Sequence, residues 1–109
     1  MTPRLAVLAF ILVGCSASNW HFDKPPSTMV VTQRVVVQKK RPILYVIHDQ
    51  DGDWRFLADL TVQLDPVVEV PFRDLVAIDS TITDLAYLKR GWKAWRSGSS
   101  APWDTDIYK

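Results

Sequence analysis

A short acidic stretch between two apolar segments constrains the fold of this chain most strongly. Residues 43–48 and 54–60 are rich in large apolar side chains, and Asp49-Gln50-Asp51-Gly52-Asp53 separates them. An Asp-Gly pair favours a type I′ turn, because both central residues of that turn need positive φ. The sequence therefore predicts a β-hairpin in the middle of the chain.

The register of this hairpin depends on which residues form the turn. With Asp51-Gly52 at its centre, one face carries an apolar row in which Ile47 faces Phe56, Tyr45 faces Ala58 and Ile43 faces Leu60. A slip of one residue would bring Arg55 and Asp59 opposite this row. We therefore expect the register that keeps the row apolar.

Two further strands are predicted on either side of the hairpin. Residues 29–38 are rich in valine, and β-branched side chains are better tolerated in strands than in helices. Gln33-Arg34 is expected to mark either a bend or an exposed stretch in this segment. Residues 67–70 predict a second short strand, and residues 61–64 are expected to extend the hairpin.

The C-terminal half predicts helices followed by a strand. Apolar residues fall at helical spacing over residues 72–78, directly after Pro71. Asp79 and Ser80 are good N-caps for a second helix over residues 81–89, which Gly91 would end. Residues 92–96 predict a last strand, in which Trp92, Ala94 and Arg96 share one face while Lys93 and Trp95 share the other.

These elements predict an α+β fold. We expect a small antiparallel sheet of three or four strands with a central β-hairpin and two short helices on one face. The 109 residues suit one domain rather than two. A formal net charge of +1 argues against nucleic-acid binding, and one cysteine supplies neither an intrachain disulfide nor a cysteine-rich metal site.

The N-terminus has the pattern of a secretory signal. Arg4 supplies a positive charge, and an unbroken apolar run follows over residues 5–13. A membrane-spanning helix needs about 20 apolar residues, so this run is too short to be one. We therefore expect export rather than a transmembrane anchor.

The end of the apolar run, Leu12-Val13-Gly14-Cys15, resembles the lipobox of bacterial lipoproteins. The resemblance implies cleavage before Cys15, a palmitate-like acyl chain on its sulfur and acylation of the new N-terminus. Several acyl chains hold a protein on a membrane where one chain does not. Ser16, in place of an Asp, implies a lipid anchor in the outer membrane of a two-membrane cell, with the protein facing the periplasm.

The chain divides accordingly into four parts. They are the signal peptide (residues 1–14), a tether (15–27), the α+β domain (28–100) and a C-terminal tail (101–109). Pro25-Pro26 makes the tether stiff and extended. Trp20 and Phe22 are expected to be loose tether residues, the alternative being that they rest on the membrane interface or on the domain.

Motifs in the domain are similar to those of a family of small uncharacterised bacterial proteins. They are Asp51-Gly52-Asp53-Trp54-Arg55-Phe56-Leu57 after a strand ending in His48-Asp49, then Gly91-Trp92 and Pro102-Trp103. Some members of this family are suspected immunity or interaction modules. The resemblance implies no catalytic residue and no cofactor.

The residues singled out for binding are Trp92, Trp95, Arg96 and Trp103, because tryptophans beside cations suit contacts with a protein, glycan or lipid phosphate. The alternative is a core strand in which one of these tryptophans is buried. His48 is expected at the surface or rim, without a nucleophile placed for catalysis. Asp49, Asp51 and Asp53 depart from the calcium-loop pattern, so no metal site is predicted, although cation binding there stays open.

The sequence favours a non-enzymatic lipoprotein that binds another envelope protein, as an immunity or accessory protein does. Two alternatives remain at this point. One is a structural factor that binds glycan or lipid through its tryptophans, and the other is a small hydrolase that uses His48.

Overall fold

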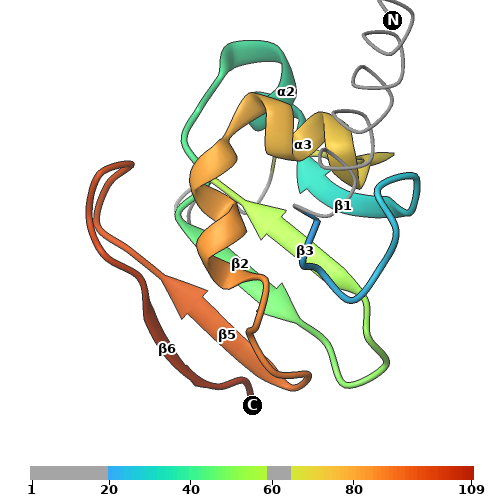
Figure 1. The fold of residues 1–109 in the computed structure, drawn as a ribbon. Coiled ribbons are helices and arrows are strands. Elements are labelled where there is room, and N and C mark those ends of the chain that lie inside the picture. Colours follow the sequence, from blue (N-terminus) through green and yellow to red (C-terminus); the bar gives the residue numbers. More distant parts are fainter. Residues whose placement is uncertain (1–19, 59–64) are drawn as a thin grey trace, which may run out of the picture.

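One mixed sheet carries the fold, with strands in the order β4-β1-β3-β2-β5-β6 (Figure 1). The computed structural model describes residues 20–58 and 65–109. The strands in these ranges are β1 (Met29–Gln33), β2 (Tyr45–His48), β3 (Trp54–Leu57), β4 (Val67–Pro71), β5 (Trp92–Trp95) and β6 (Asp104–Ile107). The α+β class is confirmed, but the described residues form six strands and three short helices, more than the sequence predicted.

The sheet is mixed because β1 runs parallel to β3, with Val31 paired to Arg55 and Thr32 to Phe56. The neighbours β4–β1, β3–β2, β2–β5 and β5–β6 are all antiparallel. The expected purely antiparallel sheet is therefore wrong. Parallel neighbours need a crossover connection, and local patterns do not reveal which strands such a connection brings together.

The predicted hairpin is confirmed, but its register lies one residue away from the expected one. The pairs are Tyr45 with Leu57, Val46 with Phe56, Ile47 with Arg55 and His48 with Trp54. In the turn, the Gly52 N–H donates to the Asp49 carbonyl at 2.9 Å, and the Asp49 N–H donates to the Asp53 carbonyl at 2.8 Å. Gly52 has a φ of 94°, and Asp51 is not in the positive region. The loop thus has three residues, ending on a left-handed glycine, instead of the two of a type I′ turn.

This register decides which side chains face the core. Val46, His48, Trp54 and Phe56 lie on the side covered by helices, which we call the helix side. Tyr45, Ile47, Arg55 and Leu57 lie on the opposite side, which we call the open side. The expected pairs of Ile47 with Phe56 and Tyr45 with Ala58 are therefore wrong. Leu60, the expected partner of Ile43, and the strand expected at residues 61–64 lie outside the described residues.

Two helices, α3 (Phe72–Ile78) and η2 (Ser80–Leu85), cover the helix side (Figure 1). The helix predicted over residues 72–78 is confirmed. The second is a shorter 3₁₀ helix in place of the α-helix expected over residues 81–89. Asp79 caps it as predicted, accepting a hydrogen bond from the Thr81 N–H at 3.1 Å. The β-branched run Thr81-Ile82-Thr83 has restricted side-chain rotamers in an α-helix, which favours the short form.

The strand expected over residues 29–38 stops at Gln33, and the helix α2 (Arg34–Lys39) follows. Gln33 makes no side-chain cap to this helix. Instead, the Asp65 carboxylate accepts from the Val35 N–H at 3.1 Å, and the Pro66 carbonyl accepts from the Arg34 N–H at 2.9 Å. A distant segment thus satisfies the first helical donors, and tertiary contact overrides the β propensity of the valines.

Residues 20–28 pack on the domain, which differs from the loose tether expected there. Phe22 is 8% exposed, and its ring centroid lies 4.3 Å from that of Phe72 and 5.2 Å from that of Trp54. Trp20 contacts Phe72 edge-on and donates its indole N–H to the Lys24 carbonyl at 2.6 Å. The aromatic core therefore includes this segment, while residues 15–19 lie outside the described residues.

The C-terminal residues also depart from the expected tail. Asp104–Ile107 form the edge strand β6, which pairs antiparallel with β5 (Figure 1). The Tyr108 N–H continues the contact by donating to the Gly91 carbonyl at 2.8 Å. In the described ranges, no helix is long and apolar enough to cross a bilayer.

Candidate interaction surfaces

The strand β5 distributes the predicted tryptophans over both sides of the sheet. Trp92 pairs with His48 and Ala94 with Val46, which places both on the helix side. Lys93 pairs with Ile47 and Trp95 with Tyr45, on the open side. The predicted alternation along this strand is confirmed, so Trp92 and Trp95 belong to two different surfaces.

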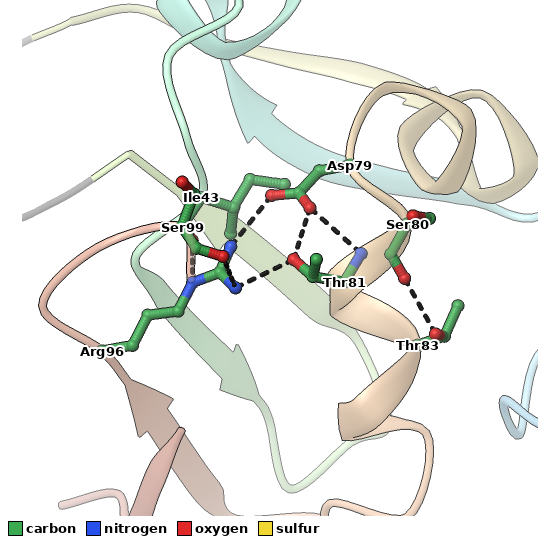
Figure 2. A network of polar contacts seen from close by, with 7 residues as sticks. All are labelled: Ile43, Asp79, Ser80, Thr81, Thr83, Arg96 and Ser99. Atoms are coloured by element: carbon green, nitrogen blue, oxygen red, sulfur yellow. Dashed lines mark hydrogen bonds and ion pairs between the residues drawn. The ribbon is translucent and has the colours of Figure 1, made fainter. Parts of the chain in front are cut away.

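Arg96 does not lie on either surface (Figure 2). Its Nε donates to the Ile43 carbonyl at 3.0 Å, and one terminal nitrogen donates to the Asp79 carboxylate at 3.0 Å. The other terminal nitrogen donates to the Thr81 hydroxyl at 2.8 Å and to the Ser99 carbonyl at 3.1 Å. With its side chain 1% exposed, Arg96 joins β5, η2 and the loop after β5.

Trp103 lies over the same guanidinium. The Arg96 Cζ is 4.2 Å from the Trp103 ring centroid, a distance typical of a cation–π contact. The indole is half-buried, so Trp103 covers the Arg96 network. The structure thus does not bring the four predicted binding residues together. It uses Arg96 and Trp103 to build the fold and exposes Trp95 and part of Trp92.

The open side carries polar and aromatic side chains, and none of the described helices packs against it. Arg55 donates two hydrogen bonds to the Asp49 carboxylate, at 3.0 and 3.1 Å. This bonding raises the pKa of Arg55, and Tyr108 adds a smaller contribution. Burial raises the pKa of Tyr45, again with a smaller contribution from Tyr108. Tyr108 therefore lies near Arg55 and Tyr45, which sequence patterns did not indicate.

Ile47 is buried on the open side, so the side chains around it form a layer over that side of the sheet. Only 4% of Ile47 is exposed, although it lies outside the aromatic core and faces the open side. On the open side, Ile47 stands between its register partners Arg55 and Lys93. Trp95 lies farther along β5 and is 37% exposed. The open side is thus a surface of aromatic, cationic and acidic residues, because Asp106 and Asp104 of β6 pair with Lys93 and Trp95 there.

The helix side has its own exposed patch beyond the helices. Trp92 pairs with Ile107, and both project toward the side that η2 covers. Tyr87, just after η2, is 77% exposed, and Ile107 is 49% exposed. Tyr87 and Trp92 line a hollow of about 280 Å³ together with Leu85 and Leu88. We call Tyr87, Trp92 and Ile107 the apolar patch. Of these three residues, only Trp92 was predicted from the sequence as a binding residue.

His48 is buried, which corrects its expected place at the surface or rim. Its Nδ1 lies 2.7 Å from the Leu88 carbonyl, so this nitrogen donates a hydrogen bond. Its Nε2 is 3.3 Å from a carboxylate oxygen of Asp23, and its ring stacks on Trp54 at 3.8 Å. The other Asp23 oxygen accepts from the Trp54 indole N–H at 2.9 Å. These contacts fasten residues 20–28 to the sheet.

The aspartates of the hairpin loop make contacts that stabilise the turn. Asp49 is held by Arg55, and the Asp51 carboxylate accepts from the Asp53 N–H at 3.1 Å. Among the residues that the structure describes, no group of three or more His, Cys, Asp or Glu side chains has the geometry to hold a metal ion. The loop sequence is therefore explained by backbone geometry.

Cys15, the predicted acylation site, lies outside the described residues. No protein-family model, curated protein or solved structure matches the chain. The N-terminal motif and the two surfaces of the sheet are therefore the features that bear on function.

Proposed function

We propose that this protein is a bacterial lipoprotein of the cell envelope, anchored by acyl chains on Cys15, whose small domain binds another envelope protein without catalysing a reaction. The observation that carries the proposal is Leu12-Val13-Gly14-Cys15 directly after a charged and apolar leader. Sulfur acylation needs a thiol, and the small neighbouring residue gives the processing peptidase access. Ser16 supports an outer-membrane location facing the periplasm.

The open side of the sheet is the proposed protein-binding surface. It presents Trp95, Tyr45 and Arg55, and tryptophan, tyrosine and arginine are the residue types that contribute most binding energy in protein interfaces. The bidentate contact with Asp49 holds the Arg55 side chain in place. A preorganised side chain loses less conformational entropy when a partner binds.

Anchoring is tested by fractionating cells that express the wild type or Cys15→Ala. We expect the wild type in the membrane fraction and the variant in the soluble fraction or in an unprocessed form. Membrane retention of a processed Cys15→Ala variant would contradict anchoring through this residue.

Partner binding is tested by photo-crosslinking in cells. A photoreactive phenylalanine analogue replaces Trp95 in one strain and, as a control, Ser97 in another. We expect one defined protein adduct, identified by mass spectrometry, from position 95 alone, and its loss when Arg55→Glu is added. An adduct that forms equally from both positions, or that ignores Arg55→Glu, would contradict the assignment of this surface.

A further inference from the structure

The apolar patch exposes side chains that a lone soluble domain usually buries. Tyr87 and Ile107 are the most exposed large apolar residues on the helix side of β5 and β6, and Trp92 joins them. Scattered exposed apolar residues need no explanation, but a contiguous group beside an apolar hollow indicates a contact surface. These residues therefore form a candidate contact surface on the helix side.

The polar residues around the patch indicate what this occupant is. Lys89 Nζ lies 5.8 Å from the Trp92 ring centroid, and the His21 ring centroid is 6.1 Å from that of Tyr87. Asp84 is the acidic side chain that lines the hollow. Tryptophan and tyrosine with a neighbouring lysine is the combination found at membrane–water interfaces, where rings lie at the headgroup level and amines reach the phosphates.

The N-terminal segment brings this patch close to the proposed anchor. Trp20 packs on Phe72, and the next residue, His21, contacts Tyr87. Cys15 precedes Trp20 by five residues, and five extended residues span at most about 18 Å. Cys15 therefore lies within about 18 Å of Trp20, whose neighbour His21 contacts Tyr87 of the patch.

We infer that the apolar patch is the membrane-facing surface of the protein, with Tyr87, Trp92 and Ile107 at the lipid headgroups. The inference rests on the proposed acylation of Cys15. A bilayer accounts for the aromatic residues, for the lysine beside Trp92 and for the short connection to the anchor. The open side then faces away from the membrane toward a partner.

The test uses the acylated full chain in vesicles of phosphatidylethanolamine and phosphatidylglycerol that contain brominated lipid. Bromine quenches tryptophans near the headgroups. Trp92→Phe and Trp95→Phe form a matched pair, because both sites lie on β5 but on opposite sides of the sheet. We expect Trp92→Phe to reduce the quenched emission, with Trp20 near the anchor supplying the rest, and Trp95→Phe to leave it unchanged.

A second variant tests the patch without touching a tryptophan. Tyr87→Ser replaces a side chain that is 77% exposed, so the fold is preserved, and quenching of Trp92 should fall. Quenching that depends on Trp95, or no quenching of a protein whose acyl chains are verified by mass, would overturn the inference while leaving the anchor intact. A dimer in detergent that Tyr87→Ser dissociates would also overturn it, because the patch would then bind a second copy. An unacylated Cys15 would instead overturn the proposed function, and this inference with it.

Discussion

Two arginine–aspartate pairs, one in the interior and one on the open side, have the same closest distance but different surroundings. Arg96 with Asp79 and Arg55 with Asp49 both approach to 3.0 Å. The side chains of the first pair are 1% and 14% exposed, and those of the second are 40% and 23% exposed. Burial decides how much each pair contributes to stability. Water competes for the charges of the exposed pair, whereas no water can replace a lost partner in the buried pair.

The buried pair should give the largest effect on stability. Arg96→Leu removes the donor that contacts Asp79 Oδ2 and leaves the Ile43 and Ser99 carbonyls without this donor. Breaking a buried ion pair costs about 3–5 kcal/mol, so the free energy of unfolding should fall by that amount. Guanidinium denaturation of the acylated protein in detergent measures it.

Arg55→Leu is the matched control on the open side. An exposed pair contributes about 0–1 kcal/mol, so this variant should unfold almost as the wild type does. Equal losses in the two variants would contradict the difference in burial on which the comparison depends.

The N-terminal segment, residues 20–28, should give the next largest effect on stability. Phe22→Ala removes a ring that packs on Phe72 and Trp54, and loss of a buried phenylalanine costs about 3–5 kcal/mol, with the lower end expected beside the surface. His21→Ala, next to it and exposed, should cost little. Thermal unfolding compares the two. If the Phe22 variant melted with the wild type, residues 20–28 would be a tether rather than part of the core.

The hairpin turn determines which side each residue of β2 and β3 faces, and one glycine tests it. Gly52→Ala places a Cβ in a left-handed residue and 3.0 Å from the Arg90 guanidinium carbon. The left-handed conformation costs about 1–2 kcal/mol for a non-glycine residue. Gly98→Ala has open space and should be neutral. Denaturation midpoints separate them, and a neutral Gly52→Ala would argue for a different loop.

The smallest effect should come from Tyr45 on the open side at high pH. The unfolded chain loses this phenol proton near the ordinary pKa of about 10. The raised pKa of Tyr45 means that the folded state keeps the proton to higher pH. The associated stability is complete below about pH 10 and declines as the pH rises toward the folded-state pKa. Tyr45→Phe should flatten this decline. Unfolding measured at a series of alkaline pH values, with phenolate absorbance as the readout, checks it, and identical slopes would contradict it.

Local sequence patterns predicted the individual helices and strands better than they predicted which of them pair or pack together. The helix over residues 72–78, the Asp79 cap and the alternation of Trp92 and Trp95 depend on nearby residues and are confirmed. The hairpin register failed because Asp-Gly is compatible with both a two-residue and a three-residue loop. The hydrogen bonds of Asp49 and the φ angle of Asp51 distinguish the two.

The remaining differences come from contacts that are distant in sequence. Asp65 caps α2 across 30 positions, and Asp79 meets Arg96 across 17. The alternation along β5 puts Arg96 on the same face as the small apolar Ala94, which was the local signal for its burial, but its partners Asp79 and Thr81 are distant in sequence. Phe22 was assigned to a tether because Pro25-Pro26 follows it, and its core contacts are with Trp54 and Phe72.

The most direct test of the account is the intact mass of the protein purified from membranes, with sequencing of its N-terminal peptide. The account predicts a chain that begins at Cys15 and carries additional mass from acyl chains on the sulfur and the terminal amine. A chain that still begins at Met1, with a free thiol at Cys15, would contradict it.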